Sequence, residues 1–173
     1  MRIKPFEIKG WQRQCLKSPA FSRLNTNPHS ILSPSGYFAD EKDFEANLGR
    51  ILKAFTSHID SQSPHRKPIL VAMDDLPLAR KHLKNVIQGL NNLGFDVYTC
   101  FYDGEGYLPV PIGTAAYVTR YFNEFNKFHN ELAGALVLTS ASHPLSKVGF
   151  RFLNADGTMF STSEMKQLDK QVD

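Results

Sequence analysis

This sequence of 173 residues has few cysteines and no long apolar run, and each shortage excludes a class of protein. Its two cysteines, Cys15 and Cys100, stand in no metal-binding or Cys-x-x-Cys spacing, so a reduced, cytoplasmic setting is the simplest interpretation. No stretch approaches the roughly 18 uninterrupted apolar residues of a membrane-spanning helix. Met1 is followed by mixed polar sequence rather than by a signal-peptide core. We therefore expect neither export nor membrane insertion.

The sequence also has little net charge. A formal charge of +3 is too small to indicate a nucleic-acid partner, although residues 1–24 hold six Lys or Arg against the single acid Glu7. Such a stretch is more typical of a solvated face or of an edge that faces phosphate. With 42% hydrophobic and 21% charged residues, the chain suits one globular domain over residues 1–173, and a chain of this size buries roughly two thirds of its unfolded surface.

Hydrophobic periodicity divides most of the chain into strands and helices. Residues 11–39 carry clusters of Ser, Pro and Asn with few periodic apolar positions, and we interpret them as an irregular segment. Strands are predicted at residues 3–10, 69–73, 95–101, 134–139 and 148–153. Helices are predicted over residues 40–59, 83–93 and 112–128, with a short last helix opened by a capping box of Ser161 and Glu164.

The order of these elements predicts a fold class. Strands that alternate with helices imply right-handed crossovers and a parallel sheet covered by helices on both faces. The strand at 148–153 follows its predecessor too closely for a helical crossover, so it pairs antiparallel at an edge. The expected fold is therefore a three-layer α/β/α domain with a mainly parallel mixed sheet and one antiparallel edge strand.

One loop of this expected fold stands out as a candidate site. The apolar run at 135–138 leads into Ser140-Ala141-Ser142-His143-Pro144, which puts a hydroxyl and an imidazole at the carboxyl end of a strand, where open α/β folds bind ligands. His143 could orient Ser142, but adjacent residues seldom point together, so a Ser-His dyad is disfavoured. Ser142 could also simply bond local backbone, as serines in turns do. Asp74, at the end of another strand, could bind a cation or cap a helix, and capping is the simpler interpretation.

The serine loop resembles the phosphoserine loop of the α-D-phosphohexomutases, the family of phosphoglucomutase and phosphomannomutase. The pattern of that family reads Thr-Ala-Ser-His-Asn-Pro, a spacer, Asn-Gly-Ile-Lys and often Asn-Ala-Asp-Gly. This chain has the loop at 140–144, then Gly149-Phe150-Arg151 and Asn154-Ala155-Asp156-Gly157. On this resemblance, Ser142 stands where the family carries its phosphoryl group.

Shorter likenesses extend along the chain in the same order. Residues 4–10 are similar to the family's opening Arg-Ala-Tyr-Asp-Ile-Arg-Gly, which puts Lys9 at the position of a substrate-facing arginine. Residues 70–74 resemble the strand that ends Val-Gly-x-Asp-x-Arg, and residues 108–111 resemble a Thr-Pro loop before the third helix. The resemblance covers only the first of the family's four domains.

The chain departs from the family pattern at three places. The Asn between His and Pro is absent from the loop, and Leu76 replaces the Arg that follows Asp74 by two places. Arg151 falls on the position of the family's lysine once the one-residue deletion is allowed. An arginine keeps the positive charge, but its pKa above about 12 prevents it from acting as a base at neutral pH.

The resemblance implies a Mg²⁺-dependent intramolecular phosphotransferase, an isomerase of carbohydrate metabolism that acts on glucose or mannose phosphates. Ser142, His143, Arg151 and Lys9 are its implied catalytic residues, and Lys9, Lys147 and Arg151 its phosphate-binding residues. In the family, the second domain supplies the Mg²⁺ aspartates, the third helps to choose the sugar and the fourth binds the substrate phosphate. Ser142 would therefore ligate metal only as phosphoserine, together with ligands from those domains, and no Mg²⁺ is expected on this chain alone.

Two functions remain open from the sequence. The chain could be the first domain of a phosphohexomutase, presenting the serine loop but incomplete as an enzyme, with a hexose phosphate as substrate once the other domains are present. It could instead be a catalytically silent binding or regulatory module, with a protein partner or self-association through the face that would meet a second domain. Dinucleotide binding ranks below both because no Gly-x-Gly-x-x-Gly follows the first strand.

Overall fold

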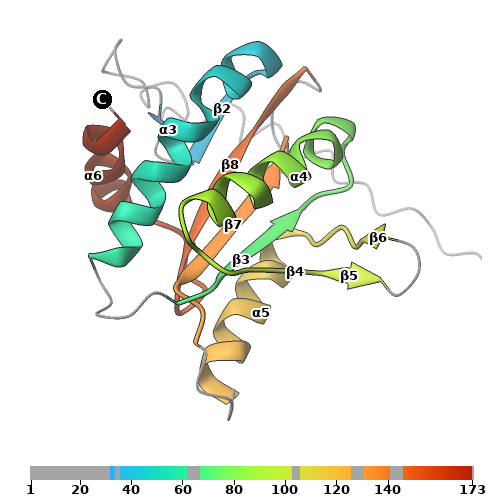
Figure 1. The fold of residues 1–173 in the computed structure, drawn as a ribbon. Coiled ribbons are helices and arrows are strands. Elements are labelled where there is room, and N and C mark those ends of the chain that lie inside the picture. The colour runs from blue at the N-terminus through green and yellow to red at the C-terminus, as the bar shows by residue number, and fades with distance from the viewer. Residues whose placement is uncertain are drawn as a thin grey trace, which may run out of the picture. The chain divides into compact units, whose positions relative to one another are not determined.

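The computed structural model describes residues 32–33, 36–61, 67–102, 106–125, 131–140 and 146–172, which all lie within the unit Ile31–Asp173. Figure 1 shows the elements of this unit. None of the described helices combines the length and apolar character needed to cross a bilayer.

A six-stranded mixed sheet forms the middle layer, with the strand order β1-β2-β8-β7-β3-β4. β3 pairs in parallel with both β4 and β7, whereas β8 pairs antiparallel with β7 and with β2, and β2 pairs antiparallel with β1. The bounds of these strands are β1 Leu32–Ser33, β2 Gly36–Asp40, β3 Ile69–Met73, β4 Val97–Thr99, β7 Gly134–Thr139 and β8 Lys147–Asn154. A separate two-stranded sheet joins β5 (Phe101–Tyr102) to β6 (Gly106–Tyr107).

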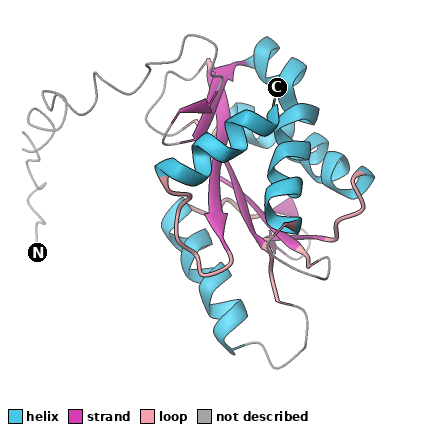
Figure 2. Cartoon of the chain, turned by 90° about the vertical axis from the view of Figure 1, so that its left-hand side faces the viewer, coloured by secondary structure: helices cyan, strands magenta, loops and turns pink. Residues whose placement is uncertain are grey.

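Helices cover both faces of the sheet. α3 (Glu41–Asp60), α4 (Pro77–Asn92) and α6 (Thr162–Val172) pack on one face, and α5 (Ile112–Phe125) packs on the other (Figure 1 and Figure 2). The capping box at α6 is confirmed, since the Ser161 amide donates to Glu164 Oε2 at 2.6 Å and the Glu164 amide donates to Ser161 Oγ at 3.3 Å. The three-layer α/β/α class predicted from the sequence is confirmed.

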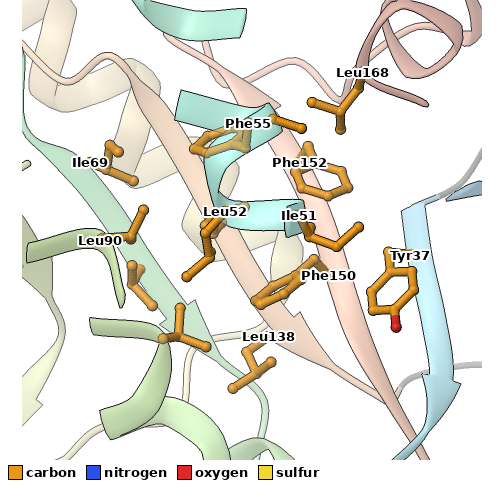
Figure 3. Packing of buried hydrophobic residues seen from close by; sticks show 14 of the residues in the cluster. Tyr37, Ile51, Leu52, Phe55, Ile69, Leu90, Leu138, Phe150, Phe152 and Leu168 are labelled. Atoms are coloured by element: carbon orange, nitrogen blue, oxygen red, sulfur yellow. The ribbon is translucent and has the colours of Figure 1, made fainter. Parts of the chain in front are cut away.

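The larger part of the core lies between the sheet and the three helices of the first face. The alternating side chains of β7 and β8 that point to this face, Leu136, Leu138, Phe150 and Phe152, are almost fully buried. Phe152 meets α3 at Phe55, with the two ring centroids 5.6 Å apart (Figure 3). A smaller cluster, including Ala115, Ala135 and Val137, lies under α5.

Two sequence expectations need correction. β8 is antiparallel to β7 as predicted, but it is not at the edge, because β2 and β1 lie beyond it. The interpretation of residues 11–39 as irregular is therefore wrong for its last part, where these two short strands form. Its earlier part, and the strand predicted at residues 3–10, lie outside the described residues.

The topology brings several element ends to one edge of the sheet. β2 and β7 are both antiparallel to β8, so they run in the same direction, which β3 shares. α3 begins directly after β2, and α4 begins four residues after β3 ends. The chain before α5 reaches the same place, where the Val110 amide donates to the Met73 carbonyl at 2.6 Å. We call this place the carboxyl edge.

Candidate functional site

Asp74 ties together two strand ends at the carboxyl edge. It follows β3, and its Oδ2 accepts hydrogen bonds from the Thr139 hydroxyl and from the Ser140 amide, the latter at 3.1 Å. Its own amide donates to the Leu138 carbonyl at 3.0 Å. The expectation that Asp74 caps a helix is wrong, because the N-cap of α4 is Leu76, which makes no side-chain capping bond. Asp74 instead fixes the start of the loop that leaves β7.

Two polar atoms at this point have no hydrogen-bond partner among the described residues. They are Asp74 Oδ1 and Ser140 Oγ, and both are buried. Buried polar groups are nearly always paired in proteins, so two such atoms within one network are unusual. Asp75, the residue after Asp74, is paired through the guanidinium of Arg80.

A cavity of about 290 Å³ opens at the carboxyl edge on the α5 face of the sheet. Its walls are mostly apolar, and its charged members are the carboxylates of Asp74 and Asp75 and the guanidinium of Arg151. The lining residues are Asp74, Asp75, Pro109, Pro111, Ile112, Val137, Thr139 and Arg151. A volume near 300 Å³ is at the small end of ligand pockets, and apolar walls with a few charged groups are typical of them.

Arg151 projects from β8 on the α5 face, directly opposite Val137 of β7. Its guanidinium carbon lies 5.3 Å from the centroid of the Phe38 ring. Burial lowers the pKa of Arg151, since a low-polarity environment disfavours the charged form. An arginine nevertheless remains protonated near neutral pH, so this is a partly desolvated positive charge beside a cavity.

Lys147 begins β8 and faces Asp40 of β2 in the register. It lies four residues before Arg151, hence on the same face of the sheet and about 13 Å away along the strand. It is half-buried and is not among the residues that line the cavity. Of the two described phosphate-binding candidates, the structure therefore places Arg151 at the cavity and Lys147 outside its lining, at the start of the same strand.

The remaining site residues predicted from the sequence lie outside the described residues. These are Ser142 and His143, between the described Ser140 and Ser146, and Lys9 near the start of the chain. Their predicted roles stay predictions. The structure describes the residues on both sides of this gap, which are Ser140 after β7 and Ser146 before β8.

Sequence reasoning named Ser140 only as the first residue of the serine loop, and it missed Thr139 and Phe38 as parts of this site. Thr139 and Ser140 lie three and two residues before Ser142. Polar residues at two neighbouring strand ends were therefore an available signal. Phe38 lies in a segment interpreted as irregular, where no local pattern indicated a strand.

Both described helix histidines, His58 of α3 and His82 of α4, are buried. His58 is 4% exposed and His82 is 0% exposed. His82 Nε2 lies 2.9 Å from Glu41 Oε1 and 3.9 Å from Glu45 Oε1. Within the described ranges these three residues form a group whose ligand atoms lie within 4.8 Å of one another. Lys81 Nζ forms an ion pair with the same Glu41 oxygen at 2.7 Å. An imidazole ligand also does not suit Mg²⁺, which prefers oxygen ligands.

Residues 39–173 match the family model described as phosphoglucomutase/phosphomannomutase, alpha/beta/alpha domain I. The match covers the carboxyl edge, the serine loop and Arg151. It begins after residues 4–10, so the likeness that places Lys9 lies outside it. A search of curated proteins finds no match.

Several solved structures share this fold. A protein of Thermus thermophilus described as a phosphomannomutase has a TM-score of 0.64 and 22% identity over 81% of this chain. The exocytosis-sensitive phosphoprotein pp63/parafusin of Paramecium, a phosphoglucomutase in its open form, has a TM-score of 0.61 and 14% identity over 86% of this chain. A phosphoglucomutase/phosphomannomutase family protein of Burkholderia thailandensis has a TM-score of 0.57 and 20% identity over 83%. The match spans 29%, 26% and 30%, respectively, of the lengths of those three chains.

Proposed function

This chain belongs to the phosphoglucomutase/phosphomannomutase family through its α/β/α domain I, and we propose that it presents a phosphoserine loop for an intramolecular phosphotransferase of carbohydrate metabolism. Ser142 is the proposed phosphoryl carrier. Arg151 and Lys147 are the proposed cations that balance the charge of the phosphoryl group, and a hexose phosphate is the proposed substrate.

The observation that carries this proposal is the hydrogen-bond network at the start of the serine loop. Asp74 Oδ2 holds Thr139 and Ser140, so the chain leaves β7 in a fixed direction at the carboxyl edge. Ser142 follows only two residues later. Ligand sites of open α/β sheets lie at this edge, and Arg151 brings a positive charge to it.

The proposed step transfers a phosphoryl group from a hexose bisphosphate to Ser142. The bond between phosphorus and the sugar oxygen breaks, a bond between phosphorus and Ser142 Oγ forms, and the proton of the serine hydroxyl passes to the departing sugar oxygen. Catalysis of such transfers depends mostly on positioning and on charge stabilisation. Arg151 supplies charge, but it cannot take the proton as a lysine with a lowered pKa could.

Mg²⁺ is part of the proposal only for a complete enzyme. When bound, it would help to neutralise the charge that spreads over the phosphoryl oxygens. The Glu41, Glu45 and His82 group does not fit it, for the reasons given above. Turnover is therefore proposed to need residues outside these 173, which span less than a third of the solved structures that they match.

Intact-mass measurement after incubation with glucose 1,6-bisphosphate and Mg²⁺ tests the carrier role. The wild-type chain is expected to gain the mass of one phosphoryl group, and Ser142→Ala is expected to gain none. Ser146→Ala is the matched control, because Ser146 is an exposed serine near the same loop and should leave the gain unchanged. If the gain is absent from the wild type, even with the other domains of a phosphohexomutase supplied in trans, or persists in Ser142→Ala, Ser142 is not the carrier.

The second candidate function is a silent binding or regulatory module. It is favoured by the arginine at 151 and by large hydrophobic side chains exposed on the α5 side. Tyr117 and Tyr121 of α5 are 64% and 52% exposed, and their ring centroids lie 5.7 Å apart.

Sedimentation over a range of protein concentrations, combined with the mass experiment, distinguishes the enzyme domain from the silent module. A chain that takes up no phosphoryl group and associates with itself favours the module, whereas a monomer that is phosphorylated on Ser142 favours the enzyme domain.

A further inference from the structure

Phe38 lies on a part of the sheet that two glycines leave open. It faces Gly149 across the β2–β8 pair, where a Cβ on Gly149 would lie 2.7 Å from Phe38 Cδ1. A Cβ on Gly36 would lie 3.2 Å from Phe38 Cε2. Both approaches are closer than nearly all real Cβ contacts, so the ring occupies space that any other residue at these two positions would restrict.

The position of the ring brings it against Arg151. Arg151 lies two residues after Gly149 on β8, on the same face of the sheet, which makes it a diagonal cross-strand neighbour of Phe38. The guanidinium carbon is 5.3 Å from the ring centroid, within the range of a cation–π contact. The same side chain lines the cavity. Arg151 therefore connects the Phe38 ring to the cavity.

The contact matters because Arg151 is partly removed from water. Burial lowers its pKa, which means that the surroundings penalise the charge. The negative face of an aromatic ring offsets part of that penalty without neutralising the charge, and the planar guanidinium suits stacking better than an ammonium group does. A ring contact thus supports the charge without itself neutralising it.

We propose that Phe38 is a positioning residue, whose ring holds the Arg151 guanidinium at the cavity in the orientation that binds a phosphate group. The inference rests on the proposed function, because that function assigns phosphate to Arg151. It adds a residue that touches no ligand and acts through Arg151.

The first test needs no ligand and uses the whole chain. The Arg151 Nε–H signal in a ¹⁵N-resolved NMR spectrum, identified by its loss in Arg151→Gln, is expected to carry a ring-current shift. Phe38→Leu should move it to the value of an arginine without a ring beside it, and Phe38→Tyr should leave it unchanged. Phe38→Met, which retains most of the volume, serves if Phe38→Leu fails to fold. An unchanged signal in both ring-free variants overturns the inference.

The second test measures binding of inorganic phosphate by calorimetry. Arg151→Gln is expected to weaken phosphate binding more than any substitution at Phe38 does. Phe38→Leu should weaken it roughly 3- to 30-fold, the effect of losing one cation–π contact, and Phe38→Tyr should restore it. Phe38→Leu should have no further effect in the Arg151→Gln background, because a positioning residue acts only through its partner.

Tyr117→Leu is the matched control, since it removes an exposed ring from the α5 side of the sheet and should leave phosphate affinity unchanged. If Phe38→Leu does not weaken binding, or weakens it equally without Arg151, the positioning role fails while the phosphate role of Arg151 stands. If Arg151→Gln leaves phosphate affinity unchanged, the proposed phosphate role itself fails, and the positioning inference fails with it.

Discussion

Asp74 follows β3, yet its hydrogen bonds go to the chain that leaves the neighbouring strand β7. One carboxylate oxygen accepts from both the Thr139 hydroxyl and the Ser140 amide, while the other is buried without a partner in the described part of the chain. A carboxylate that accepts two bonds from one segment restricts how that segment can move. Ser140, the first residue of the serine loop, is therefore held by a side chain that follows a different strand.

Asp74→Asn should lower the free energy of unfolding by about 1–3 kcal/mol, because a neutral amide cannot replace both charge-assisted bonds. Urea unfolding followed by circular dichroism measures this. Asp96→Asn is the matched control, since Asp96 is exposed just before the next strand and surface changes of this kind stay within about 0.5 kcal/mol. Equal midpoints for the two variants would show that the Asp74 network contributes nothing to stability.

At the residue scale, the sequence predicted a site in the loop after β7, which stays a prediction, and it identified only part of the surroundings that the structure describes. Polar residues after a buried strand indicated a site, and the structure brings Arg151 to the cavity there. The role of Asp74 was misjudged because capping depends on the local geometry of a helix start, which residue types do not determine. Phe38 was missed because its contact with Arg151 depends on pairing between segments more than 100 residues apart in the sequence.

At the scale of elements, β8 joins the two halves of the sheet. It carries Arg151 on one face and the buried Phe150 and Phe152 on the other, and it pairs with β7 and β2 at once. Gly149 lies where β2 approaches most closely. A Cβ there would collide with the backbone of Tyr37 and with the ring of Phe38. The close approach of β2 therefore explains why a glycine stands at this position, independently of the backbone dihedral angles.

Gly149→Ala should destabilise the domain by about 1–3 kcal/mol or more, since backbone in its path cannot swing aside as a flexible side chain can. Gly49→Ala should instead stabilise the domain. Gly49 lies in α3 with no atom within 4 Å of an added Cβ, and alanine in a helix is about 0.5–1 kcal/mol more stable than glycine. Thermal unfolding of both variants measures the difference, and a stabilising Gly149→Ala would contradict the close approach of β2.

Most elements could be predicted from the sequence because their signals are local. The apolar runs of β3 and β7 and the helical spacing of α3 lie within single segments. β1 and β2 could not be predicted, since they are short, have Pro34 between them in the sequence, and are stabilised by pairing of β2 with β8 far along the chain. Strand propensity of this kind reflects tertiary context more than sequence. Because β2 was not recognised as a strand, β8 was also predicted at the edge of the sheet, where the structure has β1 instead.

At the scale of the whole domain, the two faces of the sheet are covered unequally. Three helices and the larger core cluster lie on one face, and on the other the described residues provide α5 and a smaller cluster. The cavity, Arg151 and Phe38 are all on the α5 face. The candidate site thus lies beside the layer with less buried apolar surface to hold it.

Native-state hydrogen exchange should reveal this inequality. Amides of α5 are expected to exchange through openings of lower free energy than those of α3, because regions with fewer buried apolar contacts open locally before the domain unfolds. α3 is packed against the sheet and contacts both α4 and α6, whereas the outer face of α5 exposes Tyr117 and Tyr121. With rising denaturant, the opening free energies of the two helices should become equal only near global unfolding.

If the opening free energies of α3 and α5 coincide at every denaturant concentration, α5 does not open separately from the rest of the domain, and phosphate bound beside Arg151 could not act by stabilising α5. If they differ, saturating phosphate should narrow the gap, because Pro111 and Ile112 at the start of α5 line the cavity that Arg151 shares.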